Sequence, residues 1–230
     1  KGGNMMTEYN RIDYFSYEEL SLLGGTDLPL INFEMFQPSD FKEAKDSLEE
    51  KLLITKDGEL TDTGFKIATL VREYISAIVN IRINDMYFAP FSLEENEFIL
   101  ISRFKNNGFQ IRIIANDIAW WSIIDQYPIL MREESSDDWD FRSVDDETLA
   151  YLNNQSIDTI NRLLEIEIYN HETTQKHYIY NIYEQNEMLF IRYPLKEQIF
   201  NVHVGVINTF ILELFGLDKD SLQTNVGGVN

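Results

Sequence analysis

Three histidines are the only imidazole groups in the chain, and two of them, His171 and His177, are six residues apart. Histidine pairs that bind zinc are typically spaced i, i+4 on a helix or i, i+2 on a strand. This pair fits neither spacing, and His203 is remote in the sequence. We therefore expect ordinary surface or sheet histidines and no metal site.

A second group that could bind a cation is a run of acidic residues in the middle of the chain. Calcium loops need alternating oxygen ligands and a glycine at the sharp turn, and this run has no such glycine. The sequence therefore favours a solvated acidic loop over a cation site. The acids concerned are Asp137, Asp138, Asp140, Asp145 and Asp146.

Motifs for covalent or cofactor chemistry are absent from the sequence. The chain has no cysteine, which excludes thiolate nucleophiles and disulfides. It has no G-x-S-x-G, no P-loop and no G-x-G-x-x-G, and Gly24-Gly25 is typical of a helix end. With 39 acidic residues, a pair of carboxylates carries no information. We predict no catalytic residue and no cofactor.

Adjacent tryptophans, Trp120 and Trp121, lie in the apolar run Ala119–Ile124, which we predict to be a strand. Neighbouring side chains of a strand point to opposite faces, so one indole should be buried and the other exposed. Because exposed tryptophan is enriched at binding hot spots, the outward ring is a candidate anchor for a partner. The alternative is a central strand with a helix covering each face.

Other candidate contacts lie on predicted hairpins. Strands at 97–104 and 109–115 flank the loop Lys105–Gly108, and hairpin tips often carry recognition. A tyrosine-rich sheet face suits an amphipathic partner, although it also suits plain sheet packing. The predicted partner-binding residues are Trp120, Trp121, Phe104, Lys105, Asn106, Asn107, Phe109, Tyr178 and Tyr180.

The charge of the chain argues against nucleic acid as a partner. It has 19 basic and 39 acidic residues, a net charge of −20 and a computed pI near 4.4. Proteins that bind duplexes gain most of their affinity by neutralising phosphates with Lys and Arg. No run of about 18 apolar residues predicts a membrane span, and the start has no apolar signal core. The absence of cysteine fits a cytoplasmic protein.

The stretch from Phe41 to Tyr74 predicts a helix, a short strand, a tight turn at Gly58, a second strand and a second helix. This order occurs in DNA-reading winged helices and also in helix pairs packed on a sheet. Ser16 and Glu19 predict a capping box before it. After it we predict strands at 119–124 and 198–204, helices at 144–152, 157–164 and 206–215, and a hairpin with strands at 176–183 and 188–193.

These elements predict an α+β fold with an antiparallel sheet, because no crossover helix separates the neighbouring strands. Helices precede hairpins in each half, which suggests two quasi-symmetric halves. We expect a disordered or vector-derived N-terminus at 1–12, a single domain at 13–217 with halves of about 13–132 and 143–217, and a flexible tail at 218–230.

Short patterns near the start resemble the EspG family, the cytoplasmic chaperones of type VII (ESX) secretion, in the shorter version found in Firmicutes. Phe15-Ser16-Tyr17-Glu18-Glu19-Leu20 matches an early helix of the type fs-x-x-E-L. Ser47–Ile54 matches a helix end of the type sL-x-x-(k/r)-G-L, and Asp57–Thr61 matches a dG-x-L turn. Leu52 departs from the pattern because it stands where the family has glycine. The residue-level match covers about the first third of the chain.

The resemblance implies an EspG-like fold of two quasi-symmetric halves around an antiparallel sheet, without catalysis or cofactor. It also implies a cytoplasmic chaperone or adaptor that binds a helical secreted protein and keeps it soluble for export. In the family, the loop between two strands contributes to the contact with substrate, and Phe104 and Phe109 flank that loop here. The alternatives are an immunity protein that masks a toxin and, less favoured, a winged-helix regulator. The oligomeric state is open.

Overall fold

The computed structural model describes most of the chain. The described residues are 14–31, 41–92, 94–104, 108–133, 138–139, 141–153, 161–173, 177–185 and 187–218. Within them, no helix combines the length and the apolar character that crossing a membrane requires.

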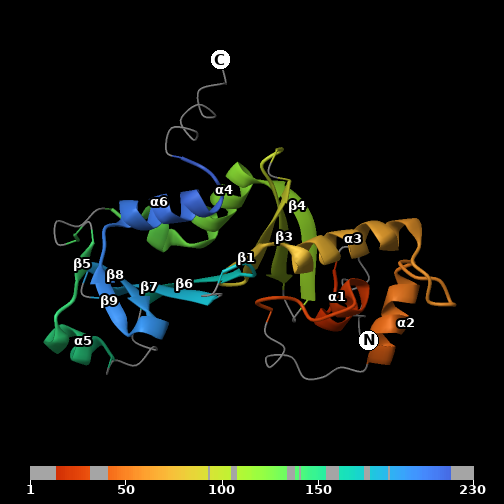
Figure 1. Cartoon of the computed structure of the whole chain (residues 1–230), viewed down its shortest axis with the longest axis horizontal. Coiled ribbons are helices and arrows are strands. Elements are labelled where there is room, and N and C mark those ends of the chain that lie inside the picture. The colour runs from red at the N-terminus through yellow and green to blue at the C-terminus, as the bar shows by residue number, and fades with distance from the viewer. Residues whose placement is uncertain are drawn as a thin grey trace, which may run out of the picture.

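A nine-stranded antiparallel sheet forms the centre of the fold (Figure 1). The strand order is β4-β3-β2-β1-β6-β7-β8-β9-β5. The strands are β1 (Val79–Ile83), β2 (Met86–Ser92), β3 (Glu97–Phe104), β4 (Gly108–Ala115), β5 (Arg142–Ser143), β6 (Asn161–Asn170), β7 (His177–Gln185), β8 (Met188–Tyr193) and β9 (Gln198–Asn201).

The sheet consists of two similar meanders that meet at its centre. Strands β1 to β4 are followed by α4 (Asn116–Gln126), and strands β6 to β9 are followed by α6 (Val204–Leu214). The meanders join where β1 pairs with β6, with Ile81 opposite Ile168. The α+β class and the antiparallel sheet are as predicted, whereas the division of the chain into halves stays a prediction.

Among the described residues, three α-helices precede the sheet: α1 (Tyr17–Gly24), α2 (Phe41–Glu50) and α3 (Asp62–Ser76). The Ser16 hydroxyl accepts from the backbone N–H of Glu19, whose carboxylate accepts from the backbone N–H of Ser16, so the predicted capping box is present. Gly25 ends α1 with φ +82°, a conformation that glycine adopts without strain. In the part of the chain that the structure describes, the other helical elements are α5 (Asp146–Asn153), η3 (Pro128–Met131) and η5 (Pro194–Lys196), besides α4 and α6.

Each face of the sheet has its own core. The α4–α6 core spans both meanders and includes Ile83, Trp120, Ile166, Ile182 and Ile211. The α1–α3 core lies on the other face, against the first meander only, and includes Phe15, Leu48, Val71, Tyr74 and Phe109. In Figure 1, α4 and α6 lie above the sheet and α1, α2 and α3 are gathered at the right.

The segment expected as helix, strand, turn, strand, helix has both helices and the turn, but the two expected strands are reduced to a single bridge between Ile54 and Leu60. Thr61 caps α3 by accepting from the backbone N–H of Gly64. Helix α3 buries Ala68, Val71 and Tyr74 in the core. In a winged helix it would be the DNA-reading element, but here its apolar side packs against the sheet.

Two expected elements are wrong. Residues 119–124 belong to the helix α4, because Ala119, Trp120 and Ile123 meet the core with helical spacing. The helix expected at 157–164 is not present in its described part, since 161–164 begin strand β6; residues 157–160 lie outside the described residues.

The C-terminal elements are shifted at their ends only. The strand expected at 198–204 ends at Asn201, and Val204 already begins α6. The loop of the second hairpin is shorter than expected, because Gln185 pairs directly with Met188.

Candidate functional site

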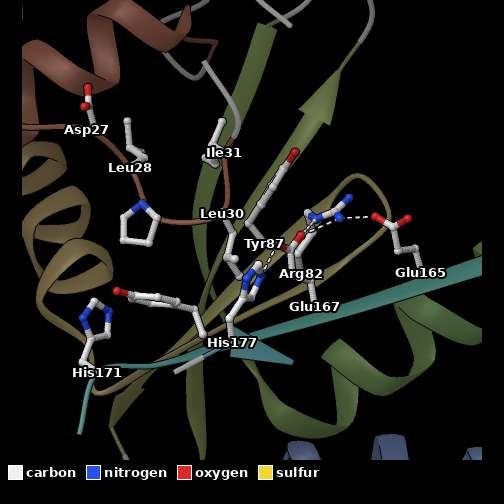
Figure 2. Close-up of a pocket in the computed structure, with 12 residues that line it drawn as sticks. Asp27, Leu28, Leu30, Ile31, Arg82, Tyr87, Glu165, Glu167, His171 and His177 are labelled. Atoms are coloured by element: carbon white, nitrogen blue, oxygen red, sulfur yellow. Dashed lines mark hydrogen bonds and ion pairs between the residues drawn. The ribbon is translucent and has the colours of Figure 1, made fainter. Parts of the chain in front are cut away.

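A cavity of about 690 Å³ lies where the two meanders meet, on the face opposite α4 and α6. Its wall is the segment Asp27–Ile31 that follows α1, and its floor is formed by β1, β2, β6 and β7 (Figure 2). The lining residues are Asp27, Leu28, Pro29, Leu30, Ile31, Arg82, Tyr87, Glu165, Glu167, Tyr169, His171 and His177.

Helices α1 and α3 hold the wall in place through buried tyrosines. The Tyr74 hydroxyl donates to the carbonyl oxygen of Pro29 at 2.7 Å, and the Tyr17 hydroxyl donates to Asp27 Oδ1 at 3.2 Å. Leu30 has φ +63°, so the backbone turns sharply at the cavity. Burial raises the pKa of Tyr17 to about 12 and that of Tyr74 well above its usual value. Both phenols therefore stay protonated and keep donating.

An ion network across the β1–β6 junction forms the floor. Arg82 Nε donates to Glu167 Oε2 at 2.6 Å, and the same guanidinium pairs with Glu165 through Nη2. Burial alone lowers the pKa of Arg82, but the carboxylates of Glu167 and Glu165 raise it more, so the group stays charged. Residues far apart in the sequence are joined here because Arg82 lies opposite Glu167 in the strand register.

Both histidines at the cavity already have protein partners. His177 Nε2 bonds to Glu167 Oε1, and His171 Nε2 lies 3.0 Å from Asn80 Oδ1. The Tyr169 ring contacts both imidazoles edge-on, with centroid distances of 4.6 Å to His171 and 6.2 Å to His177. In the described residues, no group of three or more His, Cys, Asp and Glu side chains is arranged to bind a metal ion.

This arrangement is suited to recognition. Among the described residues that line the cavity, none carries a thiol or an aliphatic hydroxyl, the usual covalent nucleophiles. The cavity instead offers aromatic rings, carboxylates and half-exposed imidazole beside the apolar wall. A concave surface of this volume, with a few convergent polar groups, is typical of a binding site.

The residues expected from the sequence to bind a partner lie elsewhere. Trp120 is 4% exposed, in the core on the opposite face of the sheet, so it packs rather than binds. Trp121 is 49% exposed on α4. Tyr180 is half-buried beneath α6, with its ring 5.1 Å from that of Phe210, and Tyr178 is also half-buried on β7.

The expected hairpin contact is only partly described. Phe109 is fully buried in the α1–α3 core and forms a β-bridge with Phe15, so its side chain does not face a partner. Lys105, Asn106 and Asn107 lie outside the described residues, as does the side chain of Phe104.

The partner-binding residues expected from the sequence do not include the polar floor of the cavity, although the sequence carries a signal for it. Glu165, Glu167 and Tyr169 alternate with Leu164, Ile166 and Ile168, which marks a strand with one polar and one apolar face. The helix expected at 157–164 overlaps the start of this strand and obscures the alternation.

Comparison with known proteins assigns the family. The model of a domain of unknown function (DUF5081) matches residues 9–223. The chain belongs to this family. The type VII secretion system protein EsaE of Staphylococcus aureus (strain USA300) is 69% identical over 220 residues, which is 96% of this chain and 98% of the relative. EsaE of strain NCTC 8325 / PS 47 gives the same values.

A solved structure shares the fold. It is the Mycobacterium tuberculosis type VII secretion chaperone EspG5 in complex with the PE25–PPE41 dimer. The TM-score is 0.55 with 6% identity, over 86% of this chain and 93% of that chain. The resemblance to EspG is therefore confirmed for the fold. This member of the DUF5081 family is a relative of a type VII secretion protein and has the fold of a type VII secretion chaperone.

Proposed function

We propose that the chain is a cytoplasmic chaperone or adaptor that binds a helical substrate of a type VII secretion system and keeps it soluble until export. The observation that carries the proposal is the recognition cavity at the centre of a chaperone-like fold. The 69% identity to EsaE supports a role in type VII secretion. The PE25–PPE41 dimer bound by EspG5 supports a secreted protein as the partner. No catalytic step and no cofactor belong to this function.

The substrate is proposed to dock at the cavity, between the Asp27–Ile31 wall and the sheet. Tyr169 and His177 are the best candidates for direct contact, because they line the cavity and are only partly buried. Arg82 and Glu167 are less suitable as direct contacts, because their side chains are only 21% and 14% exposed, against 41% for that of His177. Their role is to hold the floor in shape.

The first experiment is affinity purification of the full chain from native cytosol, with mass spectrometry of what co-purifies in equal amount. We expect one helical secreted protein. Tyr169→Ala and His177→Ala should each weaken its binding by about 1–3 kcal/mol if these side chains are anchors. Thermal melting of each variant separates lost contacts from lost folding.

Trp121→Ala is the matched comparison, because this ring is also exposed but lies on a helix of the opposite face. Binding that is unchanged in the cavity variants and weakened by Trp121→Ala would move the interface to α4, as the sequence predicted. Recovery of no secreted protein would contradict the chaperone proposal itself.

An immunity protein that masks a toxin is the second candidate, and the charge of −20 favours it. A strongly acidic protein is steered toward a basic partner, and such association slows steeply as salt rises. Recovery of a basic toxin domain in the same purification, with association that depends strongly on salt, would select this function.

A further inference from the structure

The described lining of the cavity is more negative than positive. Its ionised side chains are the carboxylates of Asp27, Glu165 and Glu167 and the guanidinium of Arg82. With the histidines counted as neutral, three negative charges against one positive leave a net charge of −2. The chain as a whole carries −20, so the surrounding potential is negative as well. A cavity with these charges attracts cations and repels anions.

Bonds within the protein occupy only part of the acidic oxygens (Figure 2). Arg82 binds Glu167 Oε2 through Nε and Glu165 Oε1 through Nη2. His177 Nε2 binds Glu167 Oε1, so both oxygens of Glu167 are used. Glu165 Oε2 receives none of these bonds, and the side chain of Glu165 is 31% exposed. Glu165 therefore offers an accessible acceptor at the floor, and Asp27, which is exposed, offers another at the wall.

The two histidines of the cavity add acceptors as well. Asn80 donates through Nδ2 to the carbonyl oxygen of Tyr74 at 2.8 Å, so its Oδ1 is the atom beside His171 Nε2. An amide oxygen and a carboxylate only accept, so His171 and His177 both donate through Nε2. In the neutral ring the other nitrogen, Nδ1, is then an acceptor. The described polar groups of the cavity thus suit a ligand that donates hydrogen bonds.

Apolar and aromatic groups lie beside these acceptors. Pro29 and Leu30 are half-buried in the wall. Tyr169 is half-buried on β6, with its ring 4.6 Å from that of His171 and 6.2 Å from that of His177. The face of a tyrosine ring attracts a cation, and the methylenes of a long basic side chain pack well on apolar surface. The cavity therefore suits a cation that is carried on an apolar stem.

We propose that the cavity takes an arginine side chain of the partner, presented by an apolar stretch of that partner. This contact depends on the docking of a substrate at the cavity, as proposed above, and specifies the chemistry of the docking segment. The guanidinium lies over the floor beside Tyr169 and His177, and neighbouring apolar side chains of the partner contact Pro29 and Leu30. Arginine fits better than lysine, because its planar guanidinium has five donors and is more weakly hydrated than an ammonium.

A bare metal ion fits this cavity less well than an organic cation. In the part of the chain that the structure describes, no three His, Asp or Glu side chains converge as metal ligands do. Both oxygens of Glu167 already accept, from Arg82 and from His177. A metal ion needs several oxygen or nitrogen ligands at one point. A guanidinium distributes its charge and its donors over a plane and does not need such a cluster.

The test uses two small probes on the full chain: N-acetyl-leucyl-arginine amide and its citrulline analogue. Citrulline replaces the guanidinium by a neutral urea of similar shape, so the two probes differ chiefly in charge. The chain has three histidines, and their Cε1–H signals in NMR spectra report on binding. His171 and His177 line the cavity, whereas His203 caps α6 on the other face of the sheet and is the internal control.

We expect the arginine probe to move the signals of His171 and His177 and to leave that of His203 in place. It should bind at least about fivefold more tightly than the citrulline probe at low salt, because only the guanidinium is attracted by the carboxylates. The preference should shrink as salt rises. Equal affinity of the two probes, or no movement of the two cavity signals at tens of millimolar arginine probe, would overturn the proposal.

Removal of the negative charge tests the contact from the side of the protein. Glu165→Gln combined with Asp27→Asn keeps the shape of both side chains, and the Asn oxygen can still accept from Tyr17. This double variant should weaken the arginine probe by about fivefold or more and leave the citrulline probe unchanged. Asp125→Asn with Glu213→Gln is the matched control, because these carboxylates are exposed on α4 and α6 of the opposite face. Equal losses in the two double variants would overturn the proposal, and thermal melting shows that both are folded.

Failure of the arginine contact and failure of the chaperone role give different results. A citrulline probe that binds as tightly as the arginine probe, and moves the same two histidine signals, would refute the cation and leave the cavity as a docking site. Recovery of no secreted protein from cytosol would refute the substrate role, even where the arginine probe binds.

Discussion

At the scale of single residues, Leu52 departs from a family pattern and is expected to lower the stability of the fold through its backbone conformation. It stands where the EspG pattern has glycine, and its backbone has φ +58° with the side chain 74% exposed. A left-handed conformation costs a residue with a Cβ about 1–2 kcal/mol, and glycine adopts it freely. Exposure means that the leucine side chain recovers little of this cost by packing.

Leu52→Gly should therefore stabilise the protein, by roughly 0.5–1 kcal/mol after the added entropy of the unfolded glycine chain is subtracted. Urea denaturation measures the change in the free energy of unfolding. Leu52→Ala is the control, because alanine loses the side chain but keeps the Cβ and its strain. Equal effects of the two substitutions would show that the backbone conformation is not the cause.

At the scale of elements, the start of α3 depends on a close approach between backbones. A Cβ added at Gly64 would lie 1.8 Å from the carbonyl oxygen of Leu53. That carbonyl also accepts from the hydroxyl and the backbone N–H of Thr61, which caps α3. The turn between α2 and α3 thus has no room for a side chain at position 64.

Gly64→Ala should destabilise the protein by about 2 kcal/mol or more, because the backbone of α3 must move away from Leu53. Thermal and urea denaturation measure the loss. Thr63→Ala, at the neighbouring exposed position, is the control and should change stability by less than about 0.5 kcal/mol. A melting temperature unchanged by Gly64→Ala would contradict this account.

Prediction of elements from the sequence worked where local signals agreed. The capping box of Ser16 and Glu19 and the hairpin pattern of β3 and β4 were sufficient to place their elements. Ala119–Ile124 was misassigned because aromatic and β-branched residues favour strands, while burial of Trp120 and Ile123 on α4 depends on tertiary packing.

The cavity could not be predicted for a different reason. It joins Arg82 to Glu165 and Glu167, and the register that brings β1 beside β6 is not encoded in either strand alone. The sequence suggested aromatic contacts, and the structure places most of them in cores or on other surfaces.

At the scale of the whole molecule, the α4–α6 core makes the two meanders interdependent. It packs Phe88 and Leu100 of the first meander with Ile182 and Leu189 of the second. Neither meander can unfold without exposing apolar surface of the other.

We therefore expect a single cooperative unfolding transition, as for a two-state domain. Far-UV circular dichroism should coincide with tryptophan fluorescence, which reports on Trp120, Trp121 and Trp139 only. Hydrogen exchange of the most protected amides in β2 and in β8 should give the same free energy of unfolding. Separate transitions for these probes would show that the meanders are independent units.

The junction of β1 with β6 also determines the order in which the protein can be completed as it is synthesised. Each meander forms from strands that are neighbours in the sequence, but the pairing of Ile83 with Ile166 requires β6 to be synthesised first. Contacts between residues far apart in the sequence form late, because closing the long loop between them costs conformational entropy before the strand pairing stabilises it. Until β6 leaves the ribosome, β1 is an unprotected edge beside an unfinished core. A protein proposed to be a chaperone for other chains thus passes through a nascent stage in which its own central strand, β1, is unpaired along one edge.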